Sequence, residues 1–335
     1  MRAVRIRAPG GLDQLETVEL ADPGAPGVGE IRVRVHASSL NYHDYRVASG
    51  DAGHFDGRIP MADGAGIVEA VGAGVSEFAV GDAVVSVFFP QWQDGRPWVG
   101  DFSQTPGDGV DGYAREVVVR PTNWFTRVPA GYSLAEAATL TTAGVTAWRA
   151  LVSDGALKAG DTVLVLGAGG VSVFALQIAR AMGATVFATS SSDAKLERLR
   201  ALGAAQTINY KKQLDWGREV ADRTGGRGVD HVIEVGGAST LSQSIAAVRV
   251  GGHISQIGAL TGRSGEVPIA ALIGKNARLQ GVTVGSRSNQ MDMIRGLEAT
   301  GLRPLIDRRF SLEQLPEAFK YQLEGRHLGK IVVEF

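Results

Sequence analysis

Residues 161–193 read DTVLVLGAGGVSVFALQIARAMGATVFATSSSD, and this stretch decides the fold of the chain around it. The apolar run 162–167 has the length and the branched side chains of a buried strand. It leads through a glycine-rich turn into residues with helical spacing up to Met182, and a second apolar run follows at 185–190. A strand, a glycine turn, a helix and another strand predict a βαβ unit whose turn is shaped to bind a phosphate.

The turn contains two of the three glycines of the dinucleotide-binding pattern. Gly167 permits the tight turn, Gly169 lets backbone N–H groups approach a pyrophosphate, and Gly170 and Val171 open the helix. Ser172 replaces the third glycine and is small enough for close packing of the helix on the strand. A methyltransferase could use a similar turn, but the repeated strand and helix alternation favours a dinucleotide. The helix face predicted to pack on the sheet consists of Val171, Phe174, Ala175, Ile178 and Met182.

The end of the second strand bears on which dinucleotide is bound. An acid that binds the ribose hydroxyls of NAD is expected about 20 residues past the turn. Hydroxyl side chains stand there instead, namely Thr189, Ser190, Ser191 and Ser192. Asp193 comes slightly late, and its place before the next helix is explained as an N-cap. Serine hydroxyls donate hydrogen bonds to a 2′-phosphate, and Lys195, with Arg198 as a second candidate, can add positive charge. The sequence therefore favours NADP(H) over NAD(H).

Length and composition limit the other possibilities. The chain has 335 residues, more than one hydrophobic core usually covers, so two domains are expected. A net charge of -1 gives no indication of nucleic acid or of an anionic membrane as partner. The absence of cysteine excludes disulfides, thiolate zinc sites and a cysteine nucleophile, and it fits a cytoplasmic location. The longest apolar run, 162–179, is interrupted by glycines, so no membrane span is predicted.

The pattern of predicted strands and helices differs between the two halves of the chain. Residues 31–37 alternate between apolar and polar side chains, and further strand-like runs bounded by turn residues occupy 64–75, 82–88 and 113–120. Together they predict an antiparallel β domain. From about residue 130 a helical stretch (134–152) precedes alternating strands and helices, which predict a doubly wound α/β domain with strands at 162–167, 185–190, 206–210, 230–235, 253–258 and 278–285. The last strand-like segments, 302–312 and 331–335, have no helices left to alternate with and are expected to return to the first domain. The predicted domains are therefore 1–124 with 288–335, and 125–287.

A long irregular loop, PQWQDGRPWVGDFSQTPGDGVDG, occupies residues 90–112. Loops of this length without regular structure are uncommon in compact domains and are often functional. The alternative is that Trp92, Trp98 and Phe102 only anchor a surface loop. The sequence leaves both interpretations open.

Several segments together resemble one known family over the whole length of the chain. They are HASSLNYHDYR (36–46), DGAGIVEAVGAGVSEFAVGDAV (63–84), LTTAGVTAWRAL (140–151), GDTVLVLGAGGV (160–171), INYKK (208–212) and HLGKIVVEF (327–335). The chain is similar to the medium-chain dehydrogenase/reductase superfamily, which contains zinc alcohol dehydrogenases and quinone oxidoreductases. The resemblance implies a GroES-like β-barrel domain, a Rossmann domain and a cofactor cleft between them. The apolar last strand (278–285) would leave an unpaired sheet edge, and with the family's habit it predicts a homodimer.

The resemblance also implies roles for single residues toward NADP(H). It places Tyr210 beside Lys195 at the 2′-phosphate and Thr146 against the nicotinamide ring. Lys330 sits where a basic residue approaches the phosphates. The residues implied along the nicotinamide half are Val235, Ile257 and Gly258, with Ser286 near the carboxamide.

The chain departs from the zinc members at the metal. A cysteine stands in those members where this chain has Asn41, a histidine where it has Ala62, and a second cysteine where it has Thr142. The structural-zinc loop corresponds to 90–112, which has no cysteine. The six histidines include no pair at metal-ligand spacing. We therefore expect a zinc-free member that binds no metal.

Without a metal, a developing oxyanion needs hydrogen-bond donors from side chains. The stretch 41–46, NYHDYR, concentrates them. By the resemblance, His43 stands where zinc alcohol dehydrogenases have the hydroxyl that relays the substrate proton, so His43 is the first candidate to donate to or orient the substrate oxygen. Asn41, Tyr42 and Tyr45 are the other catalytic candidates, and Asp44 could orient a neighbour. The alternative is that several of these side chains serve only packing.

These observations predict an NADPH-dependent oxidoreductase that transfers hydride to a quinone or an α,β-unsaturated carbonyl compound. The first alternative is a zinc-free alcohol or aldehyde dehydrogenase. The second is an NADPH-binding sensor or adaptor without turnover. The expected partners are a small electrophilic substrate and a second copy of the chain, with no nucleic acid and no membrane.

Overall fold

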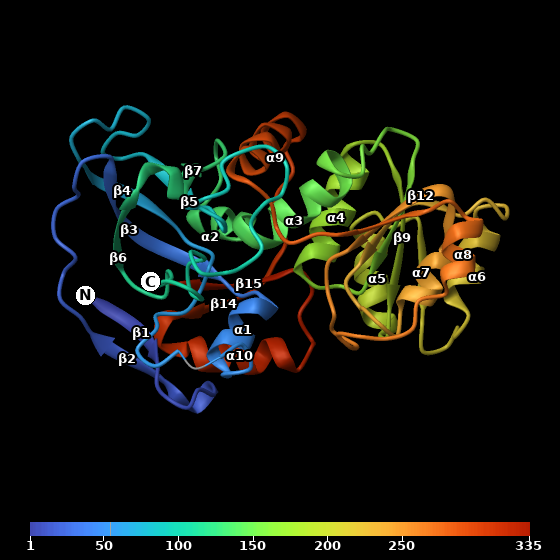
Figure 1. Cartoon of the computed structure of the whole chain (residues 1–335), viewed down its shortest axis with the longest axis horizontal. Coiled ribbons are helices and arrows are strands. Elements are labelled where there is room, and N and C mark those ends of the chain that lie inside the picture. Colours follow the sequence, from blue (N-terminus) through green and yellow to red (C-terminus); the bar gives the residue numbers. More distant parts are fainter. Residues whose placement is uncertain (54) are drawn as a thin grey trace. The chain divides into compact units, whose positions relative to one another are not determined.

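The structure is a computed structural model that describes residues 1–53 and 55–335. It forms two compact units, the first made of Met1–Val145 and Val284–Phe335 and the second of Thr146–Thr283 (Figure 1). The first unit thus extends beyond residue 124, where the sequence analysis ended it. The reason is helix α2 (Leu134–Ala138), whose buried alanines pack against Ala37, Val85 and Val332 of that unit's sheet.

A largely antiparallel sheet of seven strands forms the first unit. Its order is β14-β15-β3-β4-β5-β7, and β6 also pairs with β3. The strands are β3 (Glu30–Ser39), β4 (Ala65–Val71), β5 (Ala83–Ser86), β6 (Val117–Pro121), β7 (Phe125–Arg127), β14 (Ile306–Ser311) and β15 (Lys330–Glu334). A separate ribbon pairs β1 (Arg2–Ile6) with β2 (Leu15–Glu19). The pairing of β15 with β3 returns the end of the chain to this unit, as predicted.

The alternation in β3 explains how this sheet buries one face. Ile31, Val33 and Val35 are buried, and the residues between them are more exposed. They form a core with Val68, Val84, Val118 and Phe125. The helices that lie wholly within the first unit are α1 (Tyr42–Ala48), α2, α9 (Arg287–Thr300) and α10 (Leu315–Leu323).

The predicted helix over 134–152 is not one regular helix. Two π-helical turns, Leu140–Gly144 and Arg149–Ser153, interrupt it, with α3 (Val145–Trp148) between them. Turns of this kind inside helices are rare and are frequent at functional sites. The first of them contains Thr142.

The second unit is a parallel sheet of six strands in the order β10-β9-β8-β11-β12-β13. The strands are β8 (Thr162–Leu166), β9 (Thr185–Ser190), β10 (Gln206–Asn209), β11 (Val229–Glu234), β12 (Val248–Gln256) and β13 (Arg278–Gly281). The helices are α4 (Gly170–Ala181), α5 (Asp193–Ala201), α6 (Trp216–Arg223), α7 (Leu241–Ala247) and α8 (Ile269–Gly274). When these six strands are numbered by their order along the chain, their order across the sheet is 3-2-1-4-5-6. This is the strand order of the Rossmann fold, and it confirms the predicted fold class.

Several strand boundaries were wrong, among them those of β4, which ends at Val71, and β12, which begins at Val248. The predicted strand 278–285 ends at Gly281, and Val284 has a φ of 45° that is incompatible with an extended strand. Among the described residues, no helix combines the length and the apolar composition that crossing a bilayer requires.

Candidate cofactor and active site

The turn after β8 has the geometry that its glycines predict. Gly167 has a φ of 75°, in the left-handed region that favours glycine. Gly169 caps α4, and a Cβ added to it would meet no atom within 4 Å. Ser172 donates from Oγ to the Leu166 carbonyl at 2.6 Å, which closes the helix onto the strand end. The open side of Gly169 lies at the N-terminus of a twelve-residue helix, so the turn fits a cofactor phosphate.

The buried face of α4 is broader than predicted. Phe174, Ala175 and Ile178 are buried as expected, but Val171 and Met182 are only half-buried because they lie at the two ends of the helix. Further residues are buried that the prediction left out, namely Ser172, Val173, Leu176 and Ala179.

Most cofactor candidates of the second unit lie along one edge of its sheet. All strands are parallel, so their carboxyl ends meet at the same edge. Across the sheet the order there is Tyr210 after β10, Ser190 at the end of β9, Gly167 after β8, Val235 after β11, and Ile257 with Gly258 after β12. The candidates for the 2′-phosphate stand at one end, the phosphate turn in the middle and the nicotinamide candidates at the other end. An extended dinucleotide needs this layout.

Substituting the two turn glycines separates their roles. Gly169→Ala should keep its melting temperature, because its backbone is unstrained and its Cβ has space, but NADPH should bind about tenfold more weakly. Gly167→Ala should lose about 1 kcal/mol of stability because alanine is strained at its positive φ. Thermal melts and fluorescence titration with NADPH measure both. Unchanged NADPH binding by Gly169→Ala would place the diphosphate elsewhere.

The end of β9 is held by hydroxyl and backbone contacts. Ser190 is buried, its carbonyl accepts from the Tyr210 N–H at 3.2 Å, and its Oγ accepts from the Ser192 N–H at 3.3 Å. Ser192, and not Asp193 as the sequence suggested, is the N-cap of α5, accepting from the Lys195 N–H at 3.4 Å. The N-cap is a serine because the helix begins one residue earlier than expected. Ser191 is exposed and Lys195 half-buried at this edge.

Asp193 is the carboxylate nearest in sequence to the expected NAD position, and it is already engaged. It accepts from Lys212 Nζ at 2.6 Å and from Asn209 Nδ2 at 2.7 Å. The hydrogen bond from Lys212, assisted by Asn209, holds the pKa of Asp193 below its usual value. The strand end therefore presents hydroxyls next to a carboxylate whose charge is balanced.

A buried carboxylate that the sequence analysis did not single out shapes the other end of this edge. Glu234 is fully buried and accepts from Gly236 N–H, Gly237 N–H, Thr240 Oγ1 and Ser244 Oγ. Its carbonyl accepts from the Ile257 N–H at 2.8 Å, and a Cβ at Gly258 would lie 2.2 Å from the Val235 carbonyl oxygen. Glu234 and Gly258 thus hold the ends of β11 and β12 together. The signal in the sequence was an acid inside an apolar strand followed by two glycines.

The three other cofactor candidates do not belong to the strand ends of this sheet. Thr146 is buried in the second unit, on α3 before the first strand. Ser286 and Lys330 belong to the first unit. Ser286 is buried and caps α9, its Oγ accepting from the Asn289 N–H at 3.1 Å.

In the first unit, the stretch 41–46 begins helix α1. Asn41 is its N-cap, and Asp44 Oδ2 accepts from the Asn41 N–H at 2.9 Å and from Asn41 Nδ2 at 3.0 Å. Asp44 Oδ1 accepts from the Ala62 N–H at 2.9 Å. Burial, with the neighbouring Asp63 charge, raises the pKa of Asp44. Asp44 therefore joins the start of the helix to residue 62, which is the orienting role expected for it.

His43 lies in the first turn of α1 and faces a carboxylate from the 90–112 loop. Its Nε2 is 3.1 Å from Asp108 Oδ2, a contact at ion-pair distance that is not aligned as a hydrogen bond. The side chains are 21% and 12% exposed, respectively. The rings of Phe88 and Phe102 flank the imidazole at 5.5 and 4.8 Å between centroids. His43 is thus a partly accessible acid–base group in an apolar setting with a carboxylate beside it.

The two tyrosine candidates differ from each other. Tyr42 is 47% exposed. Tyr45 packs on the core of the first unit, with its ring 6.4 Å from that of Phe319. Tyr45 therefore fits the packing interpretation, and Tyr42 stays a possible donor.

The loop 90–112 combines anchoring and site residues. Trp92 is buried and anchors the loop, whereas Trp98 is 65% exposed. Gly107, with a φ of 83°, lies so close to Met61 that an added Cβ would be 2.7 Å from its backbone nitrogen. This contact holds the segment with Phe102 and Asp108 beside residues 60–62. Asp108 was not among the sequence candidates, because nothing local in the loop marks it.

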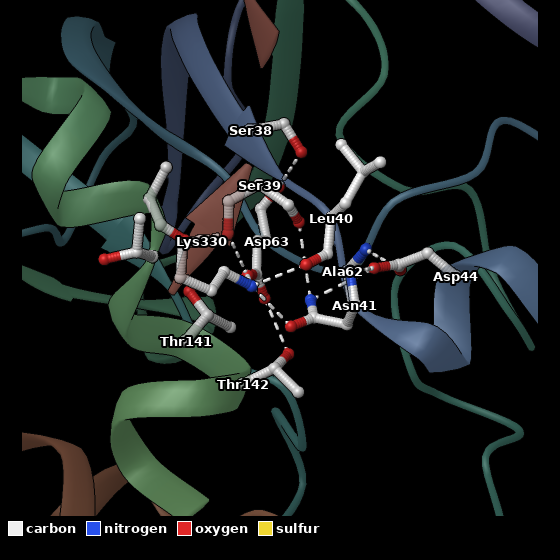
Figure 2. Close-up of polar contacts among 12 residues, drawn as sticks. Ser38, Ser39, Leu40, Asn41, Asp44, Ala62, Asp63, Thr141, Thr142 and Lys330 are labelled. Carbon is white, nitrogen blue, oxygen red and sulfur yellow. Dashed lines mark hydrogen bonds and ion pairs between the residues drawn. The ribbon is translucent and has the colours of Figure 1, made fainter. Parts of the chain in front are cut away.

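A buried polar group, here called the Lys330 cluster, consists of Ser39, Asn41, Asp63, Thr142 and Lys330 (Figure 2). Lys330 Nζ donates to the Leu40 carbonyl at 2.7 Å and to Asn41 Oδ1 at 2.6 Å, and lies 3.4 Å from Asp63 Oδ2. Asp63 also accepts from Ser39 Oγ and from Thr142 Oγ1, each at 2.6 Å. Burial lowers the pKa of Lys330, and the carboxylates oppose this effect.

Comparison with known proteins agrees with this two-part geometry. Residues 27–130 match the family model of the alcohol dehydrogenase GroES-like domain, and residues 170–299 match that of zinc-binding dehydrogenases. A zinc-type alcohol dehydrogenase-like protein of Schizosaccharomyces pombe is 42% identical over 332 residues, covering 97% of this chain and 96% of that protein. The chain belongs to the medium-chain dehydrogenase/reductase superfamily.

Solved structures of this superfamily match the whole chain. A putative alcohol dehydrogenase from Sinorhizobium meliloti 1021 has a TM-score of 0.91 and 42% identity over all of this chain and 98% of that chain. An NAD-dependent alcohol dehydrogenase has a TM-score of 0.90 and 37% identity over all of both chains. This similarity supports the assignment of the chain as an oxidoreductase that uses a nicotinamide cofactor.

More distant members show the range of chemistry in the superfamily. The crotonyl-CoA carboxylase/reductase AntE, solved in complex with NADP, has a TM-score of 0.87 and 26% identity over 94% of that chain. A quinone oxidoreductase from Pseudomonas syringae has a TM-score of 0.83 and 28% identity over 99% of that chain. Each of the two also aligns with the whole of this chain.

The superfamily's zinc does not fit the side chains of this dehydrogenase/reductase. At the three ligand positions stand an amide, a methyl and a hydroxyl group, from Asn41, Ala62 and Thr142, where zinc prefers thiolate and imidazole. Asn41 and Thr142 are moreover hydrogen-bonded within the Lys330 cluster. Across residues 1–53 and 55–335, no group of three or more His, Cys, Asp or Glu side chains is arranged to hold a metal ion.

Proposed function

We propose that this protein is an NADPH-dependent reductase of α,β-unsaturated carbonyl compounds or quinones, with His43 as the proton donor. When bound, the cofactor supplies the hydride. For an enone, NADPH and one proton give the saturated ketone and NADP⁺, with the hydride going to the β-carbon and the proton to the α-carbon. Negative charge develops on the carbonyl oxygen before the proton arrives, so the site needs a nearby donor.

The contact between His43 and Asp108 is the observation that supports this proposal most directly. A carboxylate lies 3.1 Å from Nε2, close enough to attract the imidazolium form of the ring. The flanking rings of Phe88 and Phe102 provide an apolar setting that suits a conjugated substrate. Two similar proteins, named crotonyl-CoA carboxylase/reductase and quinone oxidoreductase, are consistent with this chemistry.

The preference for NADPH rests on the end of β9. Ser190 and Ser191 offer hydroxyl groups there, and Lys195 stands in the first turn of α5. Asp193, whose free carboxylate would repel a 2′-phosphate, is paired with Lys212. Tyr210 at the neighbouring strand end is exposed enough to contact the same group.

A second candidate function is a zinc-free alcohol or aldehyde dehydrogenase. Three similar proteins bear the name alcohol dehydrogenase, one of them zinc-type. NADPH oxidation assayed with an enone and with the matching saturated ketone separates the two. We expect turnover with the enone, and the saturated ketone as the product. Turnover of only the saturated ketone would assign carbonyl reduction. Tight NADPH binding without oxidation by any of a broad set of electrophiles would instead support a sensor or adaptor.

We also propose that the protein acts in the cytoplasm as a homodimer. Strand β13 is the edge of its sheet, and a free strand edge offers backbone groups for pairing with a second copy. The absence of cysteine suits a reducing compartment.

A further inference from the structure

The three positions that hold zinc in the resembling enzymes converge on one buried ion pair in this chain (Figure 2). Asn41 contacts its cation, since Oδ1 accepts from Lys330 Nζ at 2.6 Å. Thr142 contacts its anion, since Oγ1 donates to Asp63 Oδ1 at 2.6 Å. Ala62 directly precedes Asp63 in the chain. The cluster thus joins the segments that a metal ion would otherwise join.

The ion pair is complete without a ligand. The three contacts of Lys330, with the Leu40 carbonyl, Asn41 and Asp63, match the three N–H donors of an ammonium group. Asp63 is fully buried and receives hydrogen bonds on both oxygens. Removing one buried partner leaves the other charge uncompensated, whereas removing both charges is tolerated far better. Lys330 therefore has a partner set that serves the protein interior rather than a cofactor phosphate.

The cluster is linked directly to the start of helix α1. Asn41, which Lys330 holds through its side-chain oxygen, is the N-cap of that helix. The Asn41 amide nitrogen and backbone N–H both donate to Asp44, one turn into the helix. His43 lies between these two residues. A displacement of Asn41 would therefore move the imidazole relative to Asp108.

We propose that the Lys330–Asp63 ion pair takes over the positioning role of the absent metal ion, fixing Asn41 and through it the orientation of His43. The inference rests on the proposed function of His43 as proton donor. Lys330 is thus a positioning residue that acts through Asn41 and Asp44. The positive charge that a metal would supply at this point comes from the ammonium group, held by a strand, β15, at the far end of the chain.

The test compares Lys330→Met with the double variant Lys330→Met/Asp63→Asn. In Lys330→Met the melting temperature should fall, and kcat should fall at least about tenfold. The double variant should regain most of the melting temperature because no buried charge is left unpaired, but its kcat should stay low because Asn41 still lacks its donor. If kcat recovers together with the melting temperature, the role of the pair is only structural and the proposal is wrong.

Three further measurements sharpen the test. In protein with ¹³C-labelled histidine, the NMR signal of His43, assigned with His43→Asn, should shift in both Lys330 variants. The matched control Arg149→Met removes a buried cation paired with Asp154 at 3.0 Å in the other unit, and it should lower the melting temperature while leaving kcat and the His43 signal unchanged. NADPH affinity, measured by fluorescence, should change less than about threefold in all variants, because the three N–H donors of Lys330 are directed at Leu40, Asn41 and Asp63.

The metal itself is tested by chelation. Before treatment, the wild-type enzyme should contain far less than one zinc ion per chain. After prolonged dialysis against EDTA, its kcat should stay within about twofold of the untreated value. Stoichiometric zinc whose removal abolishes activity would overturn the inference. If no enone or quinone is reduced, the proposed function fails, but an unmoved His43 signal in Lys330→Met is what contradicts the positioning role.

Discussion

Replacing His43 with asparagine is expected to lower kcat for enone reduction by about 100- to 1000-fold, the usual contribution of a general acid. Asparagine retains a polar side chain but cannot deliver a proton. The cofactor turn belongs to the other unit, so NADPH affinity should stay within about twofold. Steady-state kinetics with a fixed enone, together with fluorescence titration of NADPH, give the two quantities separately.

Three further variants locate the effect. Asp108→Asn should cost about tenfold in kcat, because the carboxylate orients the imidazole without delivering the proton itself. His36→Asn is the matched control on strand β3 and should leave kcat unchanged. If Tyr42→Phe abolishes turnover and His43→Asn does not, the exposed phenol is the donor and the assignment to His43 is wrong.

The fold could be predicted from the sequence, but the side-chain contacts of the candidate site could not. Strand and helix periodicity is local, so the alternation of strands and helices over residues 162–285 was enough to predict a doubly wound sheet. In contrast, His43 meets Asp108 and Asp63 meets Lys330 across loops whose paths no local pattern determines. In the sequence, Thr142 drew notice only because it replaces a zinc ligand of related enzymes. Its hydrogen bond to Asp63 could be found only in the structure.

The errors have local physical causes. Helix α1 has only seven residues, too few for a periodic signal, although Asn41 and Asp44 form its capping pattern. The helix expected over 134–152 is broken by π turns, which have no sequence signature. Lys330 was predicted to approach the phosphates because a basic residue stands there in the family. That role stays a prediction, and the structure adds a buried ion pair with Asp63 that no local sequence pattern indicates.

Replacing Lys195 with alanine should weaken NADPH binding about 10- to 100-fold, the range for losing a hydrogen bond to a charged group. NADH binding should change less than about threefold, because NADH has no 2′-phosphate at this position. Isothermal titration with each nucleotide measures the ratio. Equal losses for both nucleotides would refute the 2′-phosphate assignment.

The surrounding charges make the comparison specific. Arg200→Ala removes a cation from the far end of the same helix, where its guanidinium contacts Thr207 Oγ1, and should leave both affinities unchanged. Lys212→Ala should act differently from either, because it exposes the Asp193 carboxylate that Lys212 now balances. A free carboxylate repels a 2′-phosphate but accepts hydrogen bonds from ribose hydroxyls, so this variant should lose affinity for NADPH and gain affinity for NADH. The preference for NADPH would then depend on a paired acid as much as on the serines around it.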